Sequence, residues 1–254
     1  MALQEQISTD ILAGKIGKRM TVLVDEVDGV PMRFPDDLDI ADDGTIWFTD
    51  ASRRFDLHHW QLDFWEGRGS GRLLSFQPDT GEVTVHLDGL MFANGVALGP
   101  EDSFVLVNET LAARITRLWL KGPDRGKRDV FMEGLPGYPD NLSFDGEMFW
   151  VALPSPRQPA IERLADRPWI RTLLQRLLGR WRQIELPPLG WVIAVDAAGR
   201  VRESLQDTSG RCYSITSANR FDDQLLLGSL VMPHVCRFPL AASGQSTRSR
   251  LAGR

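Results

Sequence analysis

The stretch DVFMEGLPGYPDNLSFDGEMFWVAL, residues 129–153, shows the pattern that decides the fold class. A short apolar strand leads into a turn, a polar residue then opens a second strand, and a turn rich in Gly and Asp separates it from a third strand. Three further stretches follow the same order, the last more weakly: TVLVDEVDGVPMRFPDDLDIADDGTIWFTD (21–50), VTVHLDGLMFANGVALGPEDSFVLVNE (83–109) and ESLQDTSGRCYSITSANRFDDQLLLGSL (203–230).

The segments between these stretches complete the repeating unit. GRLLSFQPDTGEV (71–83), ARITRLWLKGPDRGKRDV (113–130) and GWVIAVDAAGRVRE (190–203) each have the alternation and the turn residues of a β-hairpin. The unit is therefore four antiparallel strands, repeated every 40–50 residues or so, which is typical of a β-propeller blade. A β-sandwich would also give many short strands, but it would not place a polar residue at the same point of each unit. The sequence predicts an all-β propeller of about four blades.

Composition agrees with a soluble globular protein. The chain has 254 residues, 43% of them hydrophobic and 25% charged, with a net charge of −5, which excludes disorder and argues against nucleic-acid binding. No run of about 18 apolar residues occurs, and the first 20 residues lack the apolar core of a signal peptide, so we expect a cytoplasmic protein. Cys212 and Cys236 could form one bridge, but two buried thiols are the favoured interpretation.

We divide the chain into an N-terminal extension (1–20), a propeller (21–240) and a flexible tail (241–254). Within the propeller, residues 160–184 form the strongest helical pattern, with Trp and Leu at helical spacing and arginines at the other positions. The favoured interpretation is an inserted amphipathic helix that packs on the propeller. The alternative is a helix that lies on a membrane surface, giving a peripheral membrane contact.

The repeated polar position is the strongest functional signal. It is Asp36 in RFPDDLD, Asn94 in FANGVAL and Asp140 in YPDNLSF, while the fourth unit places Thr216 or Ser217 there. In a propeller the innermost strands begin around a central channel, so these side chains are expected to converge. Oxygen ligands without thiols or imidazoles suit a hard divalent cation, above all calcium. The alternative is that each residue only caps the turn before its strand.

Other catalytic patterns are weak or missing. The chain has no GxSxG and no GxxxxGK[ST] sequence. His58, in FDLHHWQLDFWEGR, is the best imidazole candidate for a catalytic role, because this aromatic segment could roof the mouth of the channel and grip an apolar substrate. The alternative is a packed aromatic loop with surface histidines.

FANGVALGPEDSFVLVNE (92–109), LPGYPDNLSFDGEMFWVALPSPR (135–157) and GRLLSFQPDTGEVTVHLDGL (71–90) resemble the strictosidine synthase-like family. That family includes the adipocyte plasma membrane-associated proteins and belongs with the gluconolactonase (senescence marker protein) and paraoxonase group of six-bladed calcium propellers. The resemblance implies that Asn94 and Asp140 are calcium ligands, that Asp140 also acts as a base, and that Asn141 contributes beside it. The ligand from the preceding blade falls on Asp36, or on Asp37 if the register slips by one.

Two departures from the family pattern limit what the resemblance implies. Relatives take a further acidic ligand from a first blade, whereas this chain begins with what looks like the outer strand of a later blade, so roughly two blades and the true N-terminus are expected to be missing. Strictosidine synthase uses a Glu from a late blade for its condensation, and no Glu occurs here between Arg211 and the end of the chain. Alkaloid condensation is therefore not expected.

The leading hypothesis is a calcium-dependent hydrolase of lactones or aryl esters, with a small-molecule ester or lactone as its partner. The metal ligands would be Asp36, Asn94, Asp140 and Asn141, and Asp140 or His58 would activate water. The alternative is a non-catalytic propeller that acts as an interaction surface or a membrane-associated scaffold.

Overall fold

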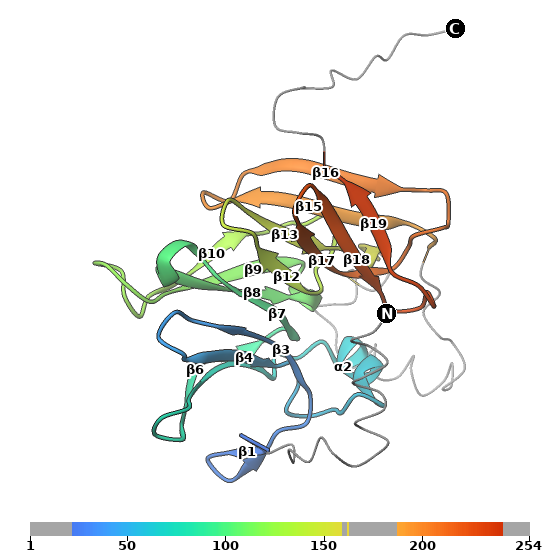
Figure 1. Ribbon diagram of the computed structural model, residues 1–254. Coiled ribbons are helices and arrows are strands. Elements are labelled where there is room, and N and C mark those ends of the chain that lie inside the picture. The colour runs from blue at the N-terminus through green and yellow to red at the C-terminus, as the bar shows by residue number, and fades with distance from the viewer. Residues whose placement is uncertain (1–21, 159–161, 163–186, 241–254) are drawn as a thin grey trace, which may run out of the picture.

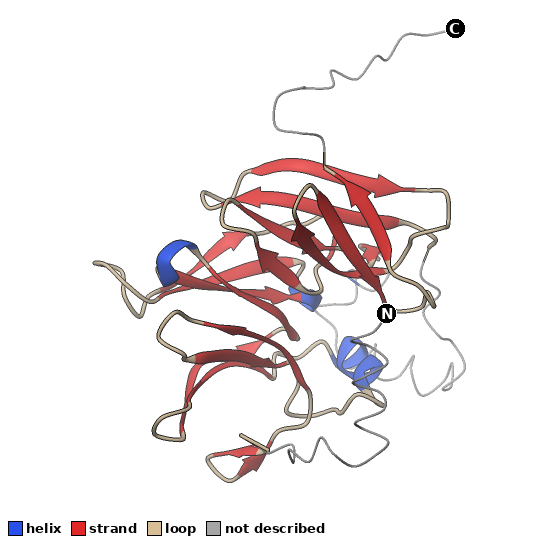
Figure 2. Cartoon of the chain, viewed as in Figure 1, coloured by secondary structure: helices blue, strands red, loops and turns tan. Residues whose placement is uncertain are grey.

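Four antiparallel sheets follow one another along an arc in the computed structural model, which describes residues 22–158, 162 and 187–240 (Figure 1). Each sheet is a meander whose first strand is the innermost, and strands dominate the structure (Figure 2). Blade 1 holds β3 (Pro35–Ile40), β4 (Ile46–Asp50), β5 (Gly71–Gln77) and β6 (Glu82–Leu90). Blade 2 holds β7 (Ala93–Leu98), β8 (Phe104–Glu109), β9 (Arg114–Trp119) and β10 (Arg128–Met132). Blade 3 holds β12 (Leu142–Phe144), β13 (Met148–Ala152), β15 (Gly190–Asp196) and β16 (Val201–Asp207). Blade 4 holds β17 (Ile215–Phe221), β18 (Gln224–Ser229) and β19 (Cys236–Pro239). The prediction of a propeller arrangement with about four blades is confirmed.

The hydrophobic cores lie between successive blades because side chains alternate across each strand. On β8, Val105 belongs to the core between blades 1 and 2, and its neighbour Leu106 belongs to the core between blades 2 and 3. On β13, Phe149 and Trp150 divide in the same way between the cores on the two sides of blade 3. Strands β8 and β13 are thus buried on both faces.

Turn residues set the length of each strand. Gly44 connects β3 to β4 with a positive φ of 86°, a conformation that glycine adopts without strain. Between β12 and β13, Asp145 accepts hydrogen bonds from the backbone N–H groups of Glu147 (2.9 Å) and Met148 (2.7 Å). These are the Gly/Asp turns that the repeat predicted.

Smaller elements lie outside the four sheets. They are the hairpin β1 (Glu26–Val27) with β2 (Val30–Pro31), the pair β11 (Gly137–Tyr138) with β14 (Ser155–Pro156), the helix α2 (Trp60–Glu66), and the 3-10 turns η1 (Pro100–Asp102) and η2 (Thr110–Ala112). The first of these differs from the expectation that the chain begins with an outer blade strand. Within the described residues, β1 and β2 pair only with each other, and the hydrogen bond from Met32 N to Asp25 O (2.8 Å) continues this hairpin.

Two other expectations need comment. The interpretation of Cys212 and Cys236 as buried thiols is wrong: the two residues form a disulfide that joins the segment before β17 to β19. The helical pattern 160–184 lies outside the described residues except at Glu162, as do the extension 1–20 and the tail 241–254. The described part of the chain contains no helix long and apolar enough to cross a membrane.

Candidate functional site

A cavity of about 290 Å³ lies where the inner strands of the four blades begin. All four blades contribute to its wall, and α2 contributes from outside the sheets. The lining residues are Phe34, Asp36, Leu57, Trp60, Phe64, Phe92, Asn94, Thr110, Tyr138, Asp140, Asn141, Pro154, Ser155, Gln158, Thr216 and Leu230.

The residues predicted as metal ligands all line this one cavity. Asp36 comes from β3, Asn94 from β7, and Asp140 and Asn141 from the residues directly before β12. Thr216, one of the two candidates in the fourth unit, joins them from β17. The repeated polar position therefore becomes one shared polar wall, and metal binding there stays a prediction.

The aromatic side of the cavity follows the same repeat two residues earlier. Phe34 precedes Asp36, Phe92 precedes Asn94, and Tyr138 precedes Asp140, each by two positions. Side chains two apart on an extended segment point to the same side. Blades 1 to 3 therefore each present an aromatic ring and a polar group to the cavity together, whereas blade 4 has Ser214 two residues before Thr216. The aromatic–x–polar pattern is visible in the sequence, although only its polar member was predicted to line the site.

Helix α2 covers the aromatic side. The segment expected to be a loop forms a helix over Trp60–Glu66 that ends at Gly67, where φ is 59°. Its Phe64 ring lies 5.4 Å from the ring of Phe92 and 6.2 Å from that of Tyr138, both edge to face. The rings of Phe34 and Phe92 are 5.5 Å apart. The predicted roof is therefore present as a cluster of interlocking rings.

The two carboxylates in the polar wall are electrostatically disfavoured. Burial, and then the negative charge of Asp36, raise the pKa of Asp140 well above its usual range, although hydrogen bonds from the Asn141 backbone and the Asn94 side chain act in the opposite direction. The pKa of Asp36 rises to about 7, because surrounding protein atoms desolvate it and Asp37 adds a like charge, even though its side chain keeps contact with solvent. A nearby positive charge, or protonation of one carboxyl group, would stabilise this pair.

Asn94 supplies the observation that tests the fit of a cation. Asn94 is 5% exposed, and its Oδ1 atom is buried without a hydrogen-bond partner in the described structure. A buried oxygen without a partner costs free energy. An amide oxygen beside two carboxylates is a donor set that fits calcium.

The set of charged ligands is small. Within residues 22–158, 162 and 187–240, no three Asp, Glu or His side chains around the cavity bring ligand atoms within 4.8 Å of one another. A cation there would have Asp36 and Asp140 as its charged ligands, with the Asn94 amide oxygen and water completing its shell.

Close backbone contacts hold the polar wall in place. A Cβ atom on Gly95 would lie 2.6 Å from Asn141 Cα and 2.6 Å from Asp140 O, so only glycine lets β7 approach β12 this closely. The carbonyl oxygen of Asp140 accepts hydrogen bonds from Gly95 N (3.3 Å) and from Asn108 Nδ2 (2.5 Å). In the FANG sequence, Asn94 thus lines the cavity, and Gly95 allows the close contact between blades 2 and 3.

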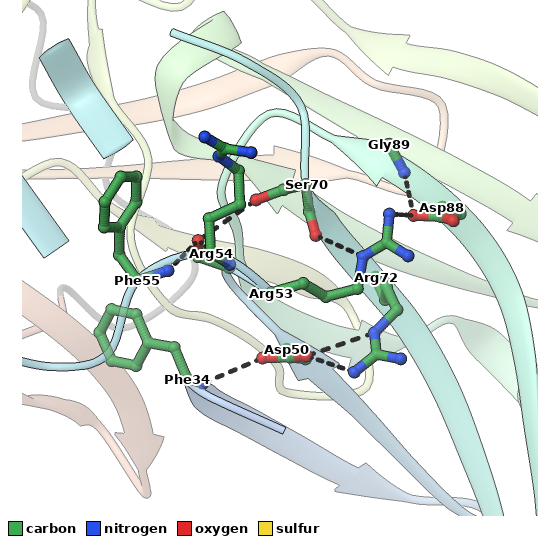
Figure 3. A network of polar contacts seen from close by, with 10 residues as sticks. Phe34, Asp50, Arg53, Arg54, Phe55, Ser70, Arg72, Asp88 and Gly89 are labelled. Atoms are coloured by element: carbon green, nitrogen blue, oxygen red, sulfur yellow. Dashed lines mark hydrogen bonds and ion pairs between the residues drawn. The ribbon is translucent and has the colours of Figure 1, made fainter. Parts of the chain in front are cut away.

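In blades 1 and 2, an ion-paired and buried carboxylate holds the residues that precede the inner strand. In blade 1, Asp50 at the end of β4 accepts from Arg72 Nη2 (2.6 Å) and from the backbone N–H of Phe34 (3.0 Å), as Figure 3 shows. In blade 2, Glu109 at the end of β8 accepts from Arg114 Nε (2.7 Å) and from the backbone N–H of Met91 (2.8 Å). We call these two groups the acid clamps. They hold Phe34 two residues before Asp36, and Met91 three residues before Asn94.

His58 and Asp37 lie apart from the polar wall. His58 is exposed in the turn before α2, where its backbone N–H donates to Asp56, and it is not among the residues that line the cavity. Asp37 Oδ2 accepts from the backbone N–H of Val96 at 3.1 Å, so it joins β3 to β7. Of the two registers left open for the first ligand, the structure places Asp36 at the cavity.

Known proteins have sequences similar to this chain over most of its length. The strictosidine synthase family model matches residues 36–123. The adipocyte plasma membrane-associated protein of Rattus norvegicus is 38% identical over 223 residues, covering 84% of this chain and 59% of that protein. Protein STRICTOSIDINE SYNTHASE-LIKE 13 of Arabidopsis thaliana is 34% identical over 236 residues, covering 90% of this chain and 55% of that protein. These matches confirm the resemblance of the chain to the strictosidine synthase-like family. The chain spans little more than half the length of these two family members.

Solved structures extend the likeness in fold. A gluconolactonase from Xanthomonas campestris superimposes with a TM-score of 0.59 at 18% identity, covering 88% of this chain and 62% of that protein. A putative gluconolactonase superimposes with a TM-score of 0.54 at 15% identity, covering 84% of this chain and 61% of that protein. This strictosidine synthase-like chain therefore has the fold of the gluconolactonase propellers.

Proposed function

We propose that the cavity is the active site of a calcium-dependent hydrolase of lactones or aryl esters. The observation that carries the proposal is the buried, unpartnered Oδ1 atom of Asn94 beside the carboxylates of Asp36 and Asp140. The gluconolactonase-like fold supports a lactone as substrate class, and the aromatic lining of the cavity supports an aryl ester.

Each part of the cavity has a task in this reaction. A calcium ion held by Asp36, Asn94 and Asp140, with Asn141 beside it, would supply positive charge to the substrate carbonyl and to the oxyanion. The aromatic wall of Phe34, Phe92 and the α2 rings binds the apolar part of the ester and excludes bulk water.

The proton has a defined destination. Asp140 accepts it from the attacking water as the oxygen bonds to the carbonyl carbon, and the proton then passes to the alkoxide when the ester C–O bond breaks. A calcium ion beside Asp140 would favour its ionised form, which is the form that can accept this proton. His58 takes no part in this scheme, because it does not line the cavity.

Thermal unfolding and ester turnover test the two halves of the proposal. Calcium at ten times its Kd should raise the Tm of the wild-type chain by about 3–6 °C, because it binds only the folded state. Asp140→Asn should raise the Tm in chelator, since a disfavoured carboxylate is removed, and should abolish the calcium increment. The same substitution should lower turnover of phenyl acetate or a simple lactone at least about 100-fold.

Asp39→Asn is the matched control. Asp39 lies on the same strand as Asp36, but its Oδ2 accepts from Leu98 N (2.8 Å) instead of lining the cavity, so the calcium increment should survive. A wild-type Tm that is equal in calcium and in chelator overturns the metal site. A calcium increment without turnover of either substrate overturns the hydrolase and leaves the non-catalytic scaffold.

A further inference from the structure

A second group of metal-ligating side chains lies in blade 4, outside the cavity. Ligand atoms of Cys212, His234 and Cys236 all lie within 4.8 Å of one another. Cys212 comes from the segment before β17, whereas His234 and Cys236 come from the start of β19 and the residues before it. His234 and Cys236 are two residues apart, so an extended backbone directs both side chains to one side.

The surroundings of the group favour ligation by the imidazole. His234 Nε2 lies 2.9 Å from the carbonyl oxygen of Arg211, and Cys236 Sγ lies 3.9 Å from the same oxygen. A backbone carbonyl that receives one ring N–H fixes the imidazole orientation, as it commonly does behind histidine ligands. The proposed function does not use any of these three residues.

In the structure the two sulfur atoms are joined, and a metal cannot use them in that state. A dithiol reductant transfers two electrons to the bond, and each sulfur gains one proton, while the reductant closes to its own disulfide. The thiols then move to van der Waals contact beside an imidazole that is already in reach. Two thiols and an imidazole form the soft ligand set that selects zinc over calcium.

We propose that the reduced form of this group binds one Zn²⁺ ion through Cys212, His234 and Cys236. Zinc displaces the two thiol protons and forms bonds of about 2.3 Å to sulfur and about 2.0–2.1 Å to nitrogen. Tetrahedral ligands at those bond lengths are about 3.3–3.8 Å apart, which the group reaches from its present spacing with small side-chain movements. The fourth position stays open to water, since Cys212 is half-buried and His234 is exposed.

Either linkage holds the same two segments together. The disulfide joins the segment before β17 to β19 in the oxidised chain, and zinc replaces that cross-link in the reduced chain. The linked segment also reaches the cavity, because Leu230 N donates to Ser214 O (3.1 Å), and Leu230 and Thr216 both line the cavity. Blade 4 thus keeps one cross-link under both redox conditions.

Zinc stoichiometry by a chromophoric chelator tests the proposal. The chain is reduced with a phosphine, desalted without oxygen, and titrated with Zn²⁺ in excess calcium, so that the oxygen ligands of the cavity do not contribute. We expect one equivalent of zinc on the reduced chain and none on the oxidised chain. Zinc should also raise the Tm of the reduced chain, and Co²⁺ in its place should give the visible absorption of a tetrahedral thiolate complex.

His234→Gln is the decisive variant, because His234 is exposed and the substitution leaves both thiols in place. Its zinc affinity should fall at least about 10-fold, with two thiols still titrated and an unchanged circular dichroism spectrum. His58→Gln is the matched control and should bind zinc as the wild type does. Equal zinc binding by the reduced and oxidised chains, or by His234→Gln and the wild type, overturns the proposal.

Discussion

Blades 1 and 2 fasten their inner strands differently from blades 3 and 4. In the first two, an acid at the end of the second strand, Asp50 or Glu109, binds an arginine of the third strand and a backbone N–H just before the inner strand. In blade 3 the second strand ends on Ala152, whose own N–H and C=O pair with Asn141 O (3.1 Å) and Asp140 N (2.9 Å). In blade 4, Ser229 Oγ donates to Tyr213 O (2.7 Å), and a disulfide adds a covalent link.

All four blades hold the start of the inner strand in place, but they do so through different kinds of interaction. In each blade the end of the second strand holds residues that precede or open the inner strand. These residues line the cavity in blades 1 and 3, and they lie one to three positions before a cavity residue in blades 2 and 4. A backbone pair needs no particular side chain, whereas an acid clamp needs a buried carboxylate and an arginine that pairs with it. The blades should therefore differ in how much stability one substitution removes.

Asp50→Ala should cause the largest loss. It leaves the Arg72 guanidinium, whose side chain is 3% exposed, without its buried partner, and breaking such a pair costs about 3–5 kcal/mol. Urea denaturation measures the free energy of unfolding. Asp50→Ala combined with Arg72→Met should recover at least about 2 kcal/mol, because the unpaired charge is gone. A double variant no more stable than the single one would show that lost packing, not the unpaired charge, is the cause.

Removal of the disulfide should have the next largest effect. Replacing both Cys212 and Cys236 by Ala frees a loop with a sequence separation of 24, for which chain entropy predicts a cost of about 3 kcal/mol. The measurement is urea unfolding in chelator without reductant. Reduced wild-type chain in chelator is the control and should lose the same amount. A loss far below this in both samples would mean that the hydroxyl contact of Ser229 already suffices to hold blade 4.

The fold was accessible from the sequence because its signal repeats. Glycine and aspartate turns, apolar strands and a polar residue at one register recur in each unit, so errors in any single unit matter little. The same register located Asp36, Asn94 and Asp140. It also carried the aromatic residues two positions earlier, and Phe34, Phe92 and Tyr138 could have been predicted from it.

Other features depended on pairing between distant positions. The Asp50–Arg72 contact requires the β4–β5 ladder register, and nothing local marks either residue as buried. The disulfide joins residues that only the connection between β17, β18 and β19 brings together, so two isolated cysteines favoured free thiols. His58 follows the end of β4 closely in sequence, but the turn that starts α2 places it on the surface.

Glu109→Gln should lower the free energy of unfolding by about 1–2 kcal/mol, which is less than Asp50→Ala. The reason is that the Arg114 side chain is 35% exposed, so water can solvate it.

The loss of stability in Glu109→Gln should depend on pH. Burial by itself raises the pKa of Glu109, but hydrogen bonds from Arg114, Thr116 and the Met91 N–H outweigh it and lower the pKa below the ordinary value of 4.5. The folded state therefore favours the charged form, so its stabilising contribution is complete above the ordinary pKa and is lost as pH falls through the folded pKa. The stability difference between wild type and Glu109→Gln should be constant from pH 7 to about 5 and shrink below that. A difference that grows as pH falls would contradict this sign.

Ser229→Ala should have the smallest effect, about 1 kcal/mol, because it removes one neutral hydrogen bond to Tyr213 O and two longer contacts from Val231 N and Met232 N, both 3.3 Å. The disulfide still limits how far the segment before β17 can move, so the loss should appear as faster hydrogen exchange in β17 more than as a lower Tm. Ser204→Ala is the control. It removes a hydroxyl on the outer strand β16 that accepts a hydrogen bond from Trp191 Nε1, and it should leave hydrogen exchange in β17 unchanged.

A sharper measurement repeats Ser229→Ala in the chain that lacks both cysteines. If the hydroxyl and the disulfide hold the same segment, the combined loss should exceed the sum of the two single losses, because each contact compensates for the absence of the other. Additive losses would mean that the two contacts act on separate parts of blade 4, and that this blade lacks a counterpart of the acid clamps.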